Sequence, residues 1–134
     1  EAPDIYCLAM NNDYMYGIIG NGRGVKPIIL DSDKIFLIAV GDKLYAFYKG
    51  KLLFSLDNQA YLIDELILLS SNRLAILSQL DIKIVEMHSG NIIWQYDFDF
   101  IEDYRIDGST VDIISEGGRF KCTLNENDGL VEKM

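Results

Sequence analysis

Basic residues, proline, histidine and cysteine are all scarce in this chain. Its 134 residues include two prolines, one histidine, two cysteines, and 12 Lys and Arg against 21 Asp and Glu, for a net charge of −9. The bases are scattered singly along the sequence. Nucleic-acid binders draw affinity from clustered Lys and Arg that neutralise phosphates. The composition therefore argues against nucleic acid as a partner, and it fits either a plain soluble surface or a partner with a basic face.

Long apolar runs are also missing. No stretch of eighteen apolar residues occurs, so we expect no membrane span. The chain starts with Glu1, Ala2 and Pro3 rather than Met, which fits a processed piece whose targeting segment has been removed. Localisation therefore stays open. With 49% apolar and 25% charged residues, the composition predicts one globular domain over residues 1–134.

The most informative feature that is present is an internal repeat. The segment KLYAFYKGKLLFSLD (residues 43–57) recurs forty positions later as KIVEMHSGNIIWQYD (residues 83–97). Upstream, IILDSDKIFLI (residues 28–38) matches ILLSSNRLAIL (residues 67–77) at an offset of thirty-nine. The repeating unit is thus about forty residues long, the length of a propeller blade.

Short apolar runs separated by turn residues predict strands within each unit. Pairs such as Gly41-Asp42, Ser89-Gly90 and Asp107-Gly108 suit tight turns, so we expect hairpins. A helix can also be drawn over residues 58–70, where Leu62, Leu66 and Leu69 share one face. The repeat match favours a strand there instead, with at most one short turn near residues 59–63.

The units fall at about residues 26–57, 65–97 and 103–132, after a shorter hairpin at residues 5–19. The motif G-x-[LI]-[LI]-[FW] with a following Asp, seen in GKLLF and GNIIW, resembles blades of the β-propeller superfamily, of the quinoprotein and WD types. The resemblance implies an all-β fold of antiparallel, propeller-like repeats, with about three full blades plus a hairpin. A closed ring takes at least four blades, so either the hairpin completes a minimal ring or another chain does.

An acidic segment is the strongest candidate for a binding site. Asp97, Asp99, Glu102 and Asp103 alternate with aromatic residues up to Tyr104. One interpretation is a solvated acidic face over a buried side that holds Phe98 and Phe100. The other is a contact site for a basic partner, anchored by the aromatic rings. The candidate partner-binding residues are Asp97, Asp99, Glu102, Asp103 and Tyr104.

Other motifs favour structural roles. His88 matches Tyr48 of the other copy and has no second histidine for a triad or a zinc site. Gly20 to Gly24 lack the spacing of a phosphate-binding loop. Cys7 and Cys122 form either two buried free thiols or a bond that locks ring closure.

Phe54 and Trp94 occupy the same repeat position, which predicts packing residues rather than a cofactor site. Neither the acidic segment nor residues 125–129 have the spacing of a calcium loop. The sequence predicts no cofactor, no metal and no catalytic residue of the chain's own. Glycoside cleavage by a pair of carboxylates from distant blades stays an open alternative.

These observations predict a non-catalytic protein-binding module. It would act as a scaffold piece of a larger assembly or as an inhibitor-like binder of a basic partner, and a homo- or hetero-oligomer would complete the ring. The alternative is a fragment of an enzyme or glycan-binding propeller whose site needs further blades. The sequence identifies neither a partner nor a substrate.

Overall fold

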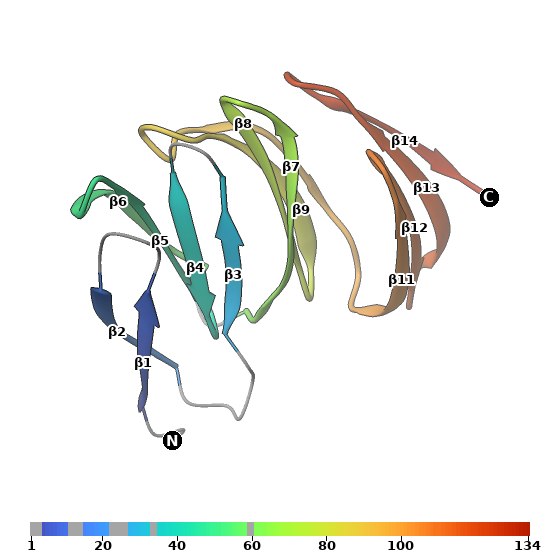
Figure 1. Ribbon diagram of the computed structural model, residues 1–134. Helices are drawn as coiled ribbons and strands as arrows, with labels where there is room; N and C mark the ends of the chain where they lie inside the picture. Colours follow the sequence, from blue (N-terminus) through green and yellow to red (C-terminus); the bar gives the residue numbers. More distant parts are fainter. Residues whose placement is uncertain (1–3, 11–14, 22–26, 33–34, 59–60) are drawn as a thin grey trace. The chain divides into compact units, whose positions relative to one another are not determined.

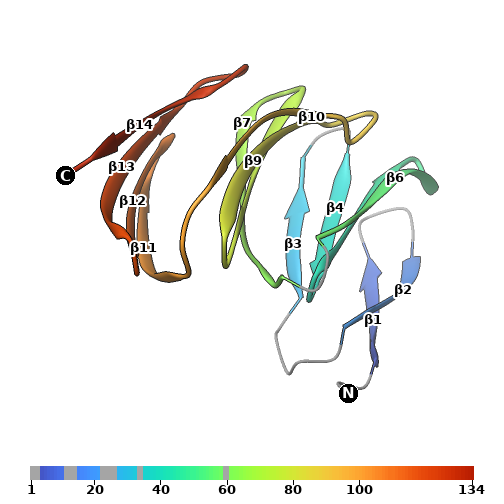
Figure 2. The same ribbon diagram turned by 180° about the vertical axis from the view of Figure 1, so that it is seen from behind.

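The computed structural model describes residues 4–10, 15–21, 27–32, 35–58 and 61–134, with side chains from Pro27 onward. These residues form fourteen strands and no helix. The first hairpin pairs β1 (Asp4–Met10) with β2 (Met15–Asn21). Three four-stranded sheets follow (Figures 1 and 2). Their strands are β3 (Ile28–Asp31), β4 (Phe36–Val40), β5 (Lys43–Tyr48), β6 (Lys51–Asp57); β7 (Ile63–Ser70), β8 (Arg73–Ser78), β9 (Asp81–Glu86), β10 (Ile92–Asp97); and β11 (Ile101–Asp107), β12 (Thr110–Ser115), β13 (Gly118–Leu124), β14 (Gly129–Lys133).

Each sheet is an antiparallel meander in which strands adjacent in sequence are adjacent in space. The predicted all-β, antiparallel class is therefore confirmed. None of the sheets in the described part of the chain closes on itself, and the propeller-like arrangement stays a prediction. A helix long and apolar enough to cross a bilayer does not occur among the described residues.

The helix drawn over residues 58–70 is wrong, because β7 runs through most of that range. Just ahead of β7, the Tyr61 backbone N–H donates a hydrogen bond to the Asn58 carbonyl at 3.1 Å. The Asn58 side-chain amide donates to the Tyr61 carbonyl at 3.0 Å. The short turn expected near residues 59–63 falls partly on residues 59 and 60, which lie outside the described part of the chain.

An irregularity of pairing occurs at matching places in the first two meanders. The β5–β6 ladder shifts register at Leu53, and the β9–β10 ladder shifts at Ile93. A bulge of this kind inserts one extra residue and increases the local twist. After each bulge, Phe54 pairs with Ala46 and Trp94 pairs with Ile84.

Backbone hydrogen bonds outside the ladders also follow a common pattern. In the β3–β6 and the β7–β10 meanders, backbone N–H groups that follow the fourth strand donate hydrogen bonds to carbonyls in the turn between the second and third strands. The bonds are Asn58 N–H to Asp42 O (2.7 Å), Ile63 N–H to Gly41 O (2.9 Å), Phe98 N–H to Leu80 O (2.7 Å) and Ile101 N–H to Gln79 O (2.8 Å).

The chain divides into two compact units, one of Glu1–Ile63 with His88–Gly90 and one of Asp64–Met87 with Asn91–Met134. The second unit packs the β7–β10 and β11–β14 sheets face to face. Strand β12 illustrates the alternation, since Val111 and Ile113 are buried while Asp112 between them is exposed. The shared core comprises Ile67, Ala75, Leu77, Ile82, Ile84, Phe98, Ile101, Val111, Ile113, Cys122 and Leu124. The single domain predicted over residues 1–134 stays a prediction.

Candidate functional site

The acidic segment runs from the end of β10 into β11, and its four carboxylates are all exposed. Asp97 ends β10, Asp99 lies in the connection, and Glu102 and Asp103 lie on β11. The β11–β12 ladder shifts register at Glu102. The irregular connection and this bulge are what turn successive carboxylates toward solvent.

The two aromatic residues of this segment have different environments. Phe98 is buried, with its ring 5.3 Å from the Phe120 ring between centroids. Phe100 is 44% exposed. The expectation that both rings share a buried side is therefore wrong for Phe100. Its exposed ring beside exposed acids is a feature of binding surfaces rather than of a core.

Asp103 and Tyr104 are neighbours on β11 and point to opposite faces of the sheet. Asp103 is exposed, and its Oδ1 accepts the Tyr104 backbone N–H at 2.8 Å. Tyr104 is half-buried, and its hydroxyl donates to Glu65 Oε1 on β7 at 2.9 Å. Burial, followed by this bond to Glu65, raises the pKa of Tyr104, so the hydroxyl stays protonated as a donor. Of the five candidate residues, Tyr104 thus has an internal bond that links β11 to β7.

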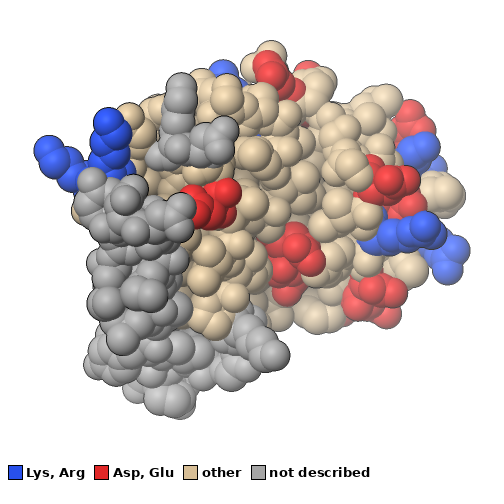
Figure 3. All heavy atoms as spheres, viewed as in Figure 1, with Lys and Arg blue, Asp and Glu red and all other residues tan. Residues whose placement is uncertain are grey.

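The face of the β11–β14 sheet that points away from the core carries a row of alternating charge. Arg105 pairs with Asp112, Asp112 with Lys121, and Lys121 with Glu132 across the four strands. All four residues are exposed. We call them the outer charge row. Figure 3 shows acidic and basic side chains intermixed at the end of the view where Figure 1 places this sheet.

Two members of the outer charge row, Arg105 and Asp112, help to line a pocket of about 380 Å³. Its outward-facing lining combines two acids, two bases and two apolar side chains: Asp103, Arg105, Asp112, Ile114, Arg119 and Met134. Opposite charges are balanced there, so the pocket favours neither a simple anion nor a simple cation. Asp103 connects it to the acidic segment. Within the described residues, no group of three or more His, Cys, Asp or Glu side chains is arranged to hold a metal ion.

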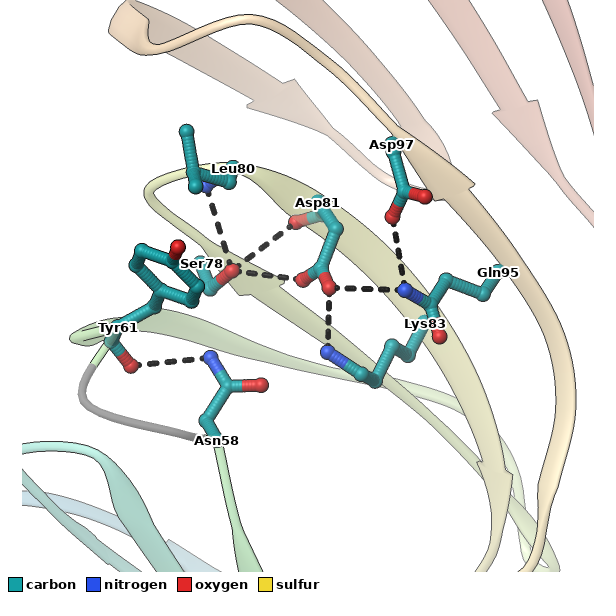
Figure 4. Close-up of polar contacts among 8 residues, drawn as sticks. All are labelled: Asn58, Tyr61, Ser78, Leu80, Asp81, Lys83, Gln95 and Asp97. Carbon is teal, nitrogen blue, oxygen red and sulfur yellow. Dashed lines mark hydrogen bonds and ion pairs between the residues drawn. The ribbon is translucent and has the colours of Figure 1, made fainter.

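Sequence reasoning missed a buried polar network on the β7–β10 sheet (Figure 4). The Asp81 carboxylate accepts hydrogen bonds from Ser78 Oγ at 2.6 Å, Lys83 Nζ at 2.5 Å and Gln95 Nε2 at 3.1 Å. Gln95 Nε2 also donates to Asp97 Oδ1 at 2.7 Å. The one sequence signal was the pair Lys83 and Asp97, which matches Lys43 and Asp57 in the other copy. With three donors on one carboxylate, Asp81 has a structural role.

The remaining sequence candidates lie apart from the acidic segment. His88 is exposed in the turn before β10. Cys122 is a free thiol in the core, and burial raises its pKa to about 11, which leaves it protonated and unreactive at neutral pH. The side chain of Cys7 and residues 22–24 of the glycine-rich stretch lie outside what the structure describes.

Comparisons with known proteins give little beyond the fold. No protein-family model matches the sequence, and no curated protein matches it. Among solved structures, the chain is similar to the computationally designed Ika8 protein, with a TM-score of 0.54 and 14% sequence identity. The similarity covers 95% of this chain and 45% of the designed chain, so this chain spans less than half the length of its structural neighbour.

Proposed function

We propose that this chain is a non-catalytic protein-binding module whose acidic segment, residues 97–104, recognises the basic face of a partner. One observation carries the proposal: Asp97, Asp99, Glu102 and Asp103 are exposed, and none forms an ion pair with a Lys or Arg among the residues that the structure describes. Exposed carboxylates that form no ion pair within the chain can attract the cationic groups of a partner. The exposed Phe100 ring supplies an apolar anchor between them.

The net charge of −9 supports the same proposal at longer range. A negative field steers a basic protein toward the surface before contact, and the effect falls as salt screens it. Charges at the rim of an interface act mainly on the rate of encounter. The proposed partner should therefore bind faster at low ionic strength.

A triple variant tests the acidic segment. Asp99→Asn, Glu102→Gln and Asp103→Asn together should slow association with an oligolysine peptide severalfold at low salt and flatten the salt dependence of the rate. Stopped-flow measurements over a range of salt concentrations provide the readout. The matched control, Asp107→Asn, Glu126→Gln and Glu132→Gln, removes the same charge from exposed positions outside the segment. Equal effects of the two variants would show that net charge alone acts, and would remove the acidic segment from the proposal.

The propeller-like arrangement is the scaffold that we propose for this module. It is supported by three consecutive four-stranded meanders, by the matching bulges at Leu53 and Ile93, and by the common pattern of backbone hydrogen bonds. Closure of a ring by another copy would place a further sheet on the outer charge row. Burying four charges costs several kcal/mol per ion unless each is paired with good geometry. We therefore propose that the outer charge row stays in contact with solvent.

Native mass tests this point. We expect a particle of 15.2 kDa by size exclusion with light scattering, because the outer charge row disfavours a covering sheet. A monomer must bind its partner with its own surface. A stable dimer or larger particle would contradict the expectation and would favour the alternative, in which a site is assembled from the blades of several chains.

A further inference from the structure

Strand β10 is an edge strand with an open side. It pairs with β9 at one end of the sheet order β10-β9-β8-β7 (Figure 2), and the structure describes no strand on its other side. Five of its six residues are exposed. Past the bulge at Ile93, residues 94–97 pair regularly with β9. The outward N–H and C=O groups of this regular stretch can template another strand.

The two faces of this stretch differ in chemistry. On the face toward the β11–β14 sheet, the Trp94 and Tyr96 rings stack with centroids 6.4 Å apart, and Tyr96 lies 4.9 Å from the Phe98 ring. The tip of the Trp94 ring reaches Gly129 at the start of β14. Tyr96 is nevertheless 38% exposed. This aromatic row offers apolar contact to any strand laid along β10.

The opposite face is polar and carries negative charge. Gln95 and Asp97 lie on this face and are both exposed. Gln95 Nε2 donates a hydrogen bond to Asp97 Oδ1 at 2.7 Å. Lys83, the basic residue of β9, forms an ion pair with the buried Asp81. The charge of Asp97 is therefore left to face solvent, and Asp99 adds a second exposed carboxylate just beyond the strand.

We propose that β10 binds an extended segment of a partner protein by strand addition, and that this segment alternates apolar and basic residues. Side chains of an added strand point alternately to the two faces. Apolar residues would then pack on Trp94 and Tyr96, while Lys or Arg would approach Gln95 and Asp97. The inference rests on the proposed function, since it specifies how the basic partner is held.

The other outer edges are better protected against strand addition. Strand β6 opens with Lys51, and β14 carries Glu132 and Lys133, so charged side chains lie along both. Natural proteins use such charges to block pairing at sheet edges. Strand β10 has neither Lys nor Pro from Ile92 to Asp97, and its one charge suits the proposed partner.

The test uses the full chain and a capped peptide of alternating Val and Lys. Trp94 is the only tryptophan, so its fluorescence reports binding at β10 directly. A block peptide of the same composition, with all Val preceding all Lys, is the matched control. We expect the alternating peptide to bind at least tenfold more tightly than the block peptide and to change Trp94 emission. N-methylation of every peptide nitrogen, which removes the backbone donors, should abolish binding.

Two variants locate the site, and one controls for charge. Tyr96→Ala should weaken binding of the alternating peptide about tenfold by removing part of the aromatic row. Asp97→Asn keeps an acceptor for Gln95 but removes the charge, and it should weaken binding severalfold. Glu132→Gln removes one charge from β14 and should leave binding unchanged. Circular dichroism confirms that each variant retains its strands.

Three outcomes would overturn the inference. Equal binding of the block peptide would mean that charge alone attracts it, which contradicts strand addition and leaves the acidic-segment proposal standing. Strand addition is also contradicted if neither peptide binds. It is contradicted as well if the chain self-associates and Tyr96→Ala abolishes the self-association, because β10 would then pair with a second copy. A different result would separate the two proposals. If the alternating peptide binds tightly, and binds equally well to the triple variant of residues 99, 102 and 103, the result supports strand addition and contradicts the proposed role of the acidic segment.

Discussion

Phe54→Ala is expected to lower the free energy of unfolding by about 3–5 kcal/mol, because truncation leaves a cavity that the surrounding strands cannot fill. The Phe54 side chain is only 8% exposed and lies on β6, opposite the fully buried Ala46 of β5. Its ring also packs against Gly90, where an added Cβ would lie 2.5 Å from Phe54 Cδ1. Gly90 has a φ of +76°, and its lack of a Cβ lets the Phe54 ring lie against its backbone.

Urea unfolding monitored by circular dichroism measures this loss. Leu52→Ala on the same strand is the control, since Leu52 is 54% exposed and its truncation should cost less than about 0.5 kcal/mol. A loss below about 1 kcal/mol for Phe54→Ala would show that the ring does not support the core. The match between Phe54 and Trp94 would then lose its structural meaning.

Much of the fold follows from local patterns in the sequence. The unit predicted at about residues 65–97 is expected to consist of strands, and β9 (Asp81–Glu86) and β10 (Ile92–Asp97) are observed within it. Turn pairs such as Gly41-Asp42 mark the hairpins because they tolerate the required backbone angles. The repeat match also favours a strand where the leucines of residues 62–69 suggest a helix, since the corresponding residues in the other copy follow Pro27.

The candidate site was only partly predictable. Exposure of the carboxylates follows from composition, since Asp and Glu are rarely buried without partners. The bulge at Glu102 and the exposed Phe100 do not follow, because a register shift depends on the neighbouring strand. The internal role of Tyr104 depends on Glu65, which is 39 positions away in the sequence. Sequence spacing within residues 97–104 contains no information about that distant acceptor.

Asp81 is a second residue whose role does not follow from the sequence. In the sequence it is one of 21 acids, at the start of a strand, and nothing distinguishes it. In the structure its carboxylate accepts from Ser78, Lys83 and Gln95, the last of which is 14 positions away. Burial is decided by the adjacent strands, so only tertiary structure shows that this acid has a structural role.

Asp81→Ala is expected to lower the free energy of unfolding by about 3–5 kcal/mol, because it leaves the Lys83 ammonium buried without its carboxylate. The side chains of Lys83 and Asp81 are 13% and 12% exposed. Urea unfolding provides the measurement. The chain contains its own control in Lys43 and Asp57, an ion pair of 3.1 Å whose side chains are 36% and 62% exposed. Asp57→Ala should cost only about 0–1 kcal/mol, since water screens that pair.

A double replacement separates the charge from the packing. Asp81→Leu combined with Lys83→Met removes both charges and keeps apolar volume, so it should recover most of the stability that Asp81→Ala loses. Ser78 then loses its carboxylate acceptor but can still donate to the Asp81 backbone carbonyl, which lies at 3.5 Å. If Asp81→Ala costs no more than Asp57→Ala, the network in Figure 4 does not stabilise the sheet. If the double replacement is as unstable as Asp81→Ala, the loss comes from the hydrogen bonds to Ser78 and Gln95 rather than from the loss of the ion pair with Lys83.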